Sequence, residues 1–142
     1  MKQEDKKLLL QDLCGRLPYG VILQCCEIVG EQLRSIDDKG LINNDYDVDE
    51  VKPMLFPLSS MTEEQEKELT TITDGKFRYM WGVITNAIPR KNISEWGTSE
   101  NAFINGMKVI NSLYIWLLKN HFDIYGLIPM GLAEDATGRN IY

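Results

Sequence analysis

The sequence is poor in the features that mark an exported or membrane-spanning protein. The charged residues 1–7 and the short run Leu8 to Leu10 do not fit a signal peptide, since Gln11 and Asp12 interrupt the apolar stretch. The most apolar later stretch, residues 113–118, is far shorter than the roughly 20 residues that span a bilayer. We therefore predict a cytoplasmic protein with no membrane partner.

Cysteine is also scarce, with three residues in the chain. Cys25 and Cys26 are adjacent, so in a strand their side chains would point to opposite faces, which suits neither a mutual disulfide nor a shared metal. An odd number of cysteines without a secretion signal favours reduced thiols. We predict that these two residues and Cys14 are buried structural thiols.

Basic residues are outnumbered by acidic ones, 15 to 21, and the formal net charge is -6. Such a charge repels polyphosphates at long range, which disfavours a nucleic-acid partner. The length of 142 residues and the content of 44% hydrophobic and 25% charged residues are typical of one folded domain. We predict a single domain over residues 1–142.

The first part of the chain predicts a helix followed by a small meander. Residues 4–17 carry Leu10, Leu13, Cys14 and Leu17 at helical spacing, which indicates an amphipathic helix. Residues 21–29 are rich in Val, Ile and Cys and predict a strand, which a turn at Gly30 and Glu31 would end. Residues 32–37 would form a second strand and residues 40–42 a third.

The remainder of the chain predicts two more helices and a late strand. Pro53 and Pro57 within residues 51–60 argue against a regular central strand. Thr62 and Gln65 have the spacing of a capping box for a helix ending near residue 72. Residues 76–84 alternate as a strand does, and residues 101–120 predict the longest helix, apolar enough to be buried on more than one side.

Together these elements predict an α+β fold. A small antiparallel sheet, built from the early meander and the late strand, would pack against the long C-terminal helix, with the N-terminal amphipathic helix at its flank.

Asp45, Asp47 and Asp49 imitate the start of a calcium-binding loop. The sixth position of that loop would be Glu50 where the sharp turn needs glycine, and the twelfth would be Phe56 where the cation needs a bidentate glutamate. The three aspartates are therefore interpreted as part of a solvated acidic loop, with no metal.

His121, the only histidine of the chain, and Asp123 are candidates for acid or base catalysis, because histidine titrates near neutral pH. A histidine just past a helix end also has a structural explanation, as a partner of free carbonyl groups. No Gly-Xaa-Ser-Xaa-Gly elbow, zinc-ligand spacing or phosphate-binding glycine loop accompanies the pair. We therefore expect no cofactor and a noncatalytic protein.

Met54, Phe56 and Leu58 lie on the proline-rich connection and are candidate binding residues. Apolar side chains on a stiff segment bind a protein partner with little loss of conformational entropy. The same side chains could equally fill the core.

Several segments together resemble a group of short uncharacterised proteins of gut anaerobic bacteria and of their phages or other mobile elements. They are LLLQDLCGRLPYGV at residues 8–21, VKP at 51–53, PLSSMTEE at 57–64, NHFD at 120–123, GLI at 126–128 and GLA at 131–133. The resemblance implies a bacterial or phage accessory protein and carries over no activity.

The leading hypothesis is thus a noncatalytic accessory or protein-interaction domain. One alternative is a small enzyme centred on His121. Another is an acidic decoy of nucleic acid, which would use a set of neighbouring carboxylates: Asp37, Asp38, Asp45, Asp47, Asp49 and Glu50.

Overall fold

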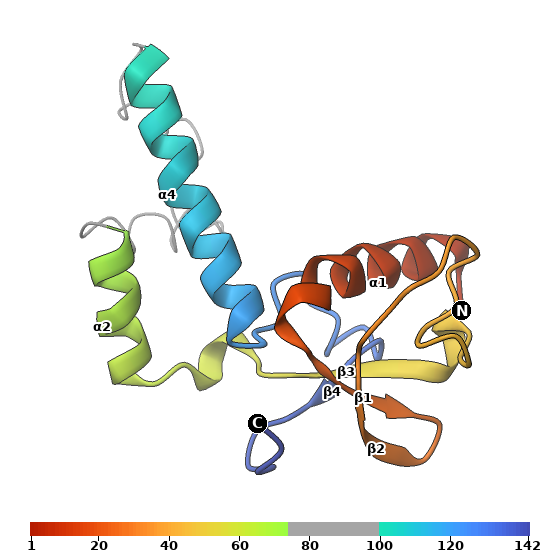
Figure 1. Cartoon of the computed structure of the whole chain (residues 1–142). Coiled ribbons are helices and arrows are strands. Elements are labelled where there is room, and N and C mark those ends of the chain that lie inside the picture. The colour runs from red at the N-terminus through yellow and green to blue at the C-terminus, as the bar shows by residue number, and fades with distance from the viewer. Residues whose placement is uncertain (74–99) are drawn as a thin grey trace. The chain divides into compact units, whose positions relative to one another are not determined.

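The computed structural model describes residues 1–73 and 100–142 (Figure 1). Its chain divides into two compact units, one formed by Met1–Ser60 with Leu117–Tyr142 and the other by Met61–Trp116. The predicted strand at residues 76–84 lies outside the described residues. That the whole chain is one domain stays a prediction.

Helix α1 (Gln3–Arg16) lies where the N-terminal helix is predicted. Its buried residues are Leu9, Asp12, Leu13 and Arg16, whose spacing of three and four places them on one face of a helix. Of the predicted apolar positions, Leu13 is buried and Leu10 and Leu17 pack half-buried against the core, whereas Cys14 is exposed, contrary to the prediction. Two charged residues, Asp12 and Arg16, are fully buried on this helix.

Strands β1 (Ile22–Cys25) and β2 (Ile28–Gln32) form an antiparallel hairpin. The prediction of one strand through residue 29 with a turn at Gly30 is wrong, because the chain turns at Cys26, which has a φ of 53°, and Glu27. Gly30 instead lies in a bulge of β2, with a φ of 124°, where the register shifts between Leu23 and Gln24. The second and third strands predicted at residues 32–37 and 40–42 are also wrong; Ile42 makes only isolated bridges there.

The sheet has the strand order β2-β1-β3-β4 and is mixed, where the prediction was antiparallel. Strand β3 (Val51–Leu55) runs antiparallel to β1 and parallel to β4 (Glu134–Asp135). The predicted irregular connection is therefore wrong over Val51–Leu55 despite Pro53. This proline lies opposite Leu23 of β1, whereas β4 pairs only with Met54 and Leu55, so Pro53 has a strand partner on one side alone.

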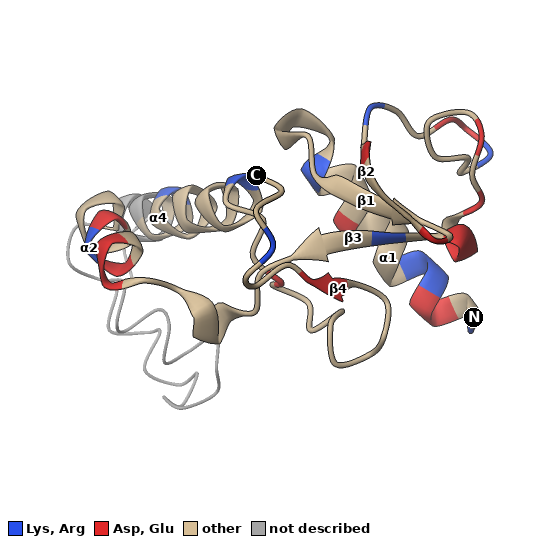
Figure 2. Ribbon diagram, turned by 90° about the horizontal axis from the view of Figure 1, so that it is seen from below, with Lys and Arg blue, Asp and Glu red and all other residues tan. Residues whose placement is uncertain are grey.

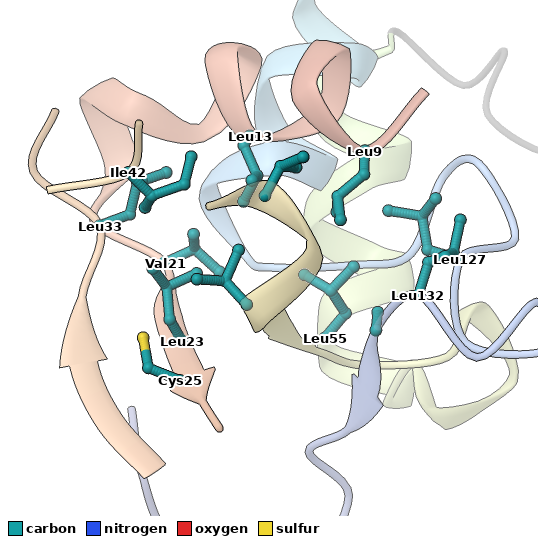
Figure 3. Close-up of a cluster of buried hydrophobic side chains, with 13 residues drawn as sticks. Leu9, Leu13, Val21, Leu23, Cys25, Leu33, Ile42, Leu55, Leu127 and Leu132 are labelled. Carbon is teal, nitrogen blue, oxygen red and sulfur yellow. The ribbon is translucent and has the colours of Figure 1, made fainter. Parts of the chain in front are cut away.

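The core of the first unit lies between α1 and the sheet (Figure 3). Leu9 and Leu13 of α1 pack in one cluster with Leu23 of β1, Leu55 of β3 and Leu127 of the C-terminal segment. Each of these five side chains is fully buried, and burial of a leucine contributes about 1.5–3 kcal/mol to folding. Segments from both ends of the chain therefore share one apolar core with α1 as its helical layer.

The second unit contains α2 (Glu63–Ile72) and most of α4 (Glu100–Lys119). The predicted capping box of α2 is confirmed: Thr62 Oγ1 accepts from the backbone N–H of Gln65 at 3.2 Å, and Gln65 Oε1 accepts from that of Thr62 at 2.9 Å. Packing of the sheet against the C-terminal helix stays a prediction, because the sheet and most of α4 belong to different units.

Candidate functional site

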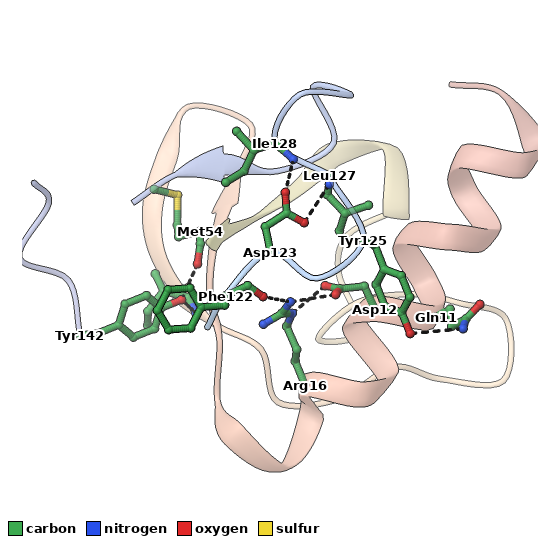
Figure 4. A network of polar contacts seen from close by, with 11 residues as sticks. Gln11, Asp12, Arg16, Met54, Phe122, Asp123, Tyr125, Leu127, Ile128 and Tyr142 are labelled. Atoms are coloured by element: carbon green, nitrogen blue, oxygen red, sulfur yellow. Dashed lines mark hydrogen bonds and ion pairs between the residues drawn. The ribbon is translucent and has the colours of Figure 1, made fainter. Parts of the chain in front are cut away.

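An ion pair lies in the interior of the first unit (Figure 4). Arg16 Nε donates to Asp12 Oδ2 at 2.7 Å, and its Nη2 donates to Asp12 Oδ1 at 2.9 Å. Both side chains have 0% of their surface exposed. Burial raises the pKa of the Asp12 carboxyl, and it outweighs the lowering effect of the Arg16 charge. The bidentate geometry compensates part of the cost of removing two charges from water.

Arg16 also fastens α1 to the C-terminal segment. Its Nη2 donates to the backbone carbonyl of Phe122 at 2.7 Å. The third guanidinium nitrogen, Nη1, is buried without a hydrogen-bond partner among the described residues. Through its bonds to Asp12 and Phe122, Arg16 links α1 to a segment 106 residues further along the chain.

Asp123 holds the turn that follows Phe122 (Figure 4). Its Oδ1 accepts from the backbone N–H of Leu127 at 2.8 Å, and its Oδ2 accepts from that of Ile128 at 2.9 Å. Its own N–H donates to the carbonyl of Phe56 at 2.8 Å. Both carboxylate oxygens therefore have backbone partners, and the side chain is only 6% exposed.

His121 adopts a φ of 61°, a backbone conformation that is uncommon outside glycine. Its ring stacks on that of Tyr142 with 3.8 Å between centroids and 12° between planes. Burial, with a smaller contribution from the Arg16 charge, lowers the pKa of His121 to about 4. This pKa leaves the ring neutral at pH 7. Its Nδ1 is buried without a hydrogen-bond partner in the described part of the chain.

The predicted pair His121 and Asp123 is close in sequence, but no hydrogen bond joins the two side chains in the structure as described. A histidine with a pKa of about 4 is a weak general base at neutral pH. The oxygens of Asp123 are occupied by the turn. A catalytic role for the pair stays a prediction, while the contacts that are present give both residues structural roles.

The three candidate binding residues of the proline-rich segment are not equally accessible. Met54 is fully buried, as the core-filling alternative expects, and its carbonyl accepts from the hydroxyl of Tyr142 at 2.7 Å. Phe56 and Leu58 are half-buried. The Phe56 ring lies against Tyr142 and Phe122, with centroids 5.8 and 6.3 Å away. Core packing therefore accounts for much of this segment.

Asp45, Asp47 and Asp49 are all exposed, as a solvated loop requires. Asp47 caps the short 3-10 helix Val48–Glu50, and Asp49 pairs with Lys6 of α1 at 2.8 Å. Among the described residues no group of three or more His, Cys, Asp or Glu is placed to hold a metal ion.

The cysteines differ in environment. Cys25 is buried, and burial raises the pKa of its thiol to about 11. Cys14 and Cys26 are exposed, so the prediction of three buried thiols is wrong for both. Cys26 is exposed because it forms the hairpin turn, which the sequence did not reveal.

Two surface features were not singled out from the sequence. The first is a group of exposed apolar side chains on α4, where burial on more than one side was expected: Ile104, Met107, Ile110, Tyr114 and Ile115. We call this group the α4 face. The 3–4 spacing of Met107, Ile110 and Tyr114 is a signal that could have identified it.

The second is a depression of about 420 Å³ beside the first half of α1. Lysines from two segments line it, Lys6 and Lys7 from α1 and Lys39 from a loop. We call it the lysine pocket. Lys39 lies more than 30 residues from Lys6 and Lys7, and no motif in the sequence relates the two segments. The site is therefore visible only in the folded structure.

The ion pair predicts a nonadditive effect of substitution. Asp12→Asn or Arg16→Met alone leaves one buried group without its partner, which should lower the free energy of unfolding by about 3–5 kcal/mol. The double variant should be clearly more stable than the sum of the two losses predicts. Urea unfolding of the four proteins measures the coupling, and losses below about 1 kcal/mol in both single variants would contradict a buried pair.

His121 predicts a pH dependence of stability. Its pKa is about 4 in the folded chain and near 6.5 when unfolded, so between these values the unfolded chain binds more protons. The contribution of neutral His121 is complete above pH 6.5 and is lost as the pH falls toward 4. His121→Asn removes the titration and tolerates the positive φ. Unfolding measured from pH 7.5 to 4 should show a shallower decline for the variant, whereas parallel curves would refute the assignment.

No protein-family model matches the chain, and neither a curated protein nor a solved structure matches it significantly. No helix within the described residues has the length and apolar character needed to cross a membrane.

Proposed function

We propose that the chain is a noncatalytic protein-interaction domain and that the α4 face is its contact surface. The observation that carries the proposal is the exposure of the five large apolar side chains, each 36–48% exposed within a stretch of twelve residues. Folded proteins that act alone rarely leave apolar side chains contiguous at the surface, because each loses the free energy of burial.

The five side chains gather on one side of the helix. At 100° per residue, Ile104, Met107, Ile110, Tyr114 and Ile115 fall within about 140° of its circumference. Between Ile104 and Ile115 this arc contains one polar residue, Asn111, and no charge. Lys108 lies just outside it. The surface therefore suits an apolar partner and gives no basis for recognising a charged one.

The spacing of the face favours a helix as that partner. Ile104, Met107, Asn111 and Tyr114 repeat at intervals of three and four, the pattern of a seam between two packed helices. A single asparagine within an apolar seam is known to fix the register of such pairs. We infer that the partner presents an amphipathic helix whose apolar side covers the α4 face.

The polar groups of the first unit support a noncatalytic function. Asp12 and Arg16 are buried with each other, and both oxygens of Asp123 hold a turn. His121 is neutral and stacked on Tyr142. These residues stabilise the fold. Recognition of a protein partner would therefore use the exposed surfaces.

The α4 face is tested by adding charge to it. A Met107→Glu/Ile110→Glu variant should lose its partner, because two carboxylates would have to be buried against an apolar helix. Affinity purification of the tagged full chain from cells that produce it, with quantitative mass spectrometry, should show at least about a tenfold loss of a reproducible set of proteins. Light scattering of the purified chain would show whether that partner is a second copy.

A matched control is Ser112→Glu, which adds the same charge to an exposed position of α4 outside the arc. The control should retain the partners of the unchanged chain, and circular dichroism should show equal helix content in all three proteins. Equal recovery of partners by the face variant and the control would contradict the proposal. So would a monomeric chain from which no partner is reproducibly recovered.

A further inference from the structure

We infer that the lysine pocket binds a small organic anion of the phosphomonoester class. The pocket lies in the first unit, between the first half of α1, the loop that contains Lys39 and the start of the 3-10 helix at Val48. Its volume of about 420 Å³ is within the range of small-molecule sites, roughly 300–1,000 Å³.

The charge of the pocket is opposite to that of the chain. The chain carries a net charge of -6, yet three lysines, Lys6, Lys7 and Lys39, line this pocket, where Asp47 is the one acidic residue of the lining. Basic and acidic positions are both present along α1 (Figure 2). The carboxylate of Asp47 accepts the backbone N–H of Glu50 in the cap of the 3-10 helix. The lining therefore has more ammonium groups than carboxylates available to a ligand.

The three lysines are not equally committed. Lys6 pairs with Asp49 at 2.8 Å, which fixes its position, and this carboxylate raises the pKa of Lys6. Lys7 and Lys39 make no ion pair within the described residues, and both are exposed. Two ammonium groups are thus free to bind an anion, as point charges of the kind that commonly bind phosphate.

The loop that carries Lys39 is ordered by its own contacts. Asp37 Oδ1 accepts from the backbone N–H groups of Lys39 at 2.9 Å and Leu41 at 2.8 Å. The N–H of Gly40 donates to the Asp37 carbonyl at 3.0 Å, with a φ of 83° that glycine adopts without strain. A preformed loop loses little conformational entropy when the ligand binds.

Apolar side chains complete the lining. Leu10 of α1 and Val48, which is largely buried, lie beside the lysines. A ligand that carries a hydrocarbon or aromatic group next to its phosphate would satisfy both parts of the pocket, whereas a long polyanion would be repelled by the rest of the surface. These features together define the ligand class.

Phenyl phosphate is a suitable probe of this class. Calorimetric titration of the full chain at low salt should show saturable binding of phenyl phosphate. Its affinity should be higher than that of inorganic phosphate. Lys7→Gln and Lys39→Gln should each weaken it by about tenfold, and raised salt should weaken it further. Lys67→Gln and Lys119→Gln remove the same charge from exposed positions outside the pocket and should leave the affinity within about twofold.

The outcomes separate the alternatives. Equal weakening by the pocket variants and the control variants would show a general charge effect and overturn the inference. Absence of saturable binding at millimolar phenyl phosphate would also overturn it. Equal affinity for inorganic phosphate and phenyl phosphate would refute the organic part of the assignment, since Leu10 and Val48 would then contribute nothing.

Discussion

The architecture of the first unit depends on the buried pair of Asp12 and Arg16. The guanidinium group satisfies the carboxylate and, with the same Nη2, holds the carbonyl of Phe122. It is the buried polar link between α1 and the C-terminal segment, which otherwise meet through apolar contacts and a longer, exposed hydrogen bond of 3.5 Å from Gln11 to the Tyr125 hydroxyl. Hydrogen bonds specify position more sharply than apolar contacts do. The carbonyl anchored at Phe122 lies between the two residues, His121 and Asp123, whose backbones pair with Phe56.

The buried polar groups and the exposed surfaces of the protein have different roles. The ionisable groups of the interior are engaged in structure, so they offer little to a substrate. The two proposed recognition surfaces, the α4 face and the lysine pocket, use exposed or pocket-lining residues that do not belong to this buried network. The pocket uses α1 as well: Leu9 and Leu13 face the core, while Lys6, Lys7 and Leu10 line the depression. One helix therefore serves both the core and the proposed anion site.

The sequence predicted the α+β class, the N-terminal helix and the cap at Thr62, because local spacing determines these features. It predicted a hairpin but placed the turn at Gly30 and Glu31, since Cys26 and Glu27 are not typical turn residues and strand-forming residues continue through Val29. Strand β3 was missed because the tolerance of a sheet for Pro53 depends on how far its neighbour β4 extends. The burial of Asp12 and Arg16 was not predicted, because charged residues on a helix are usually exposed to water. Only the fold shows that the Phe122 carbonyl accepts from Arg16. The lysine pocket depends on the same long-range assembly.

Native-state hydrogen exchange tests the central role of the ion pair most directly. The amides of Asp123 and Leu127 bond to Phe56 and to the Asp123 side chain. If Arg16 fastens this segment to α1, these amides exchange together with those of α1, at the free energy of global unfolding. In Arg16→Met the C-terminal amides should separate from α1 and exchange through a local opening. Exchange of the C-terminal amides by local opening in the unchanged chain, while α1 remained protected, would show that the ion pair does not hold the two segments together.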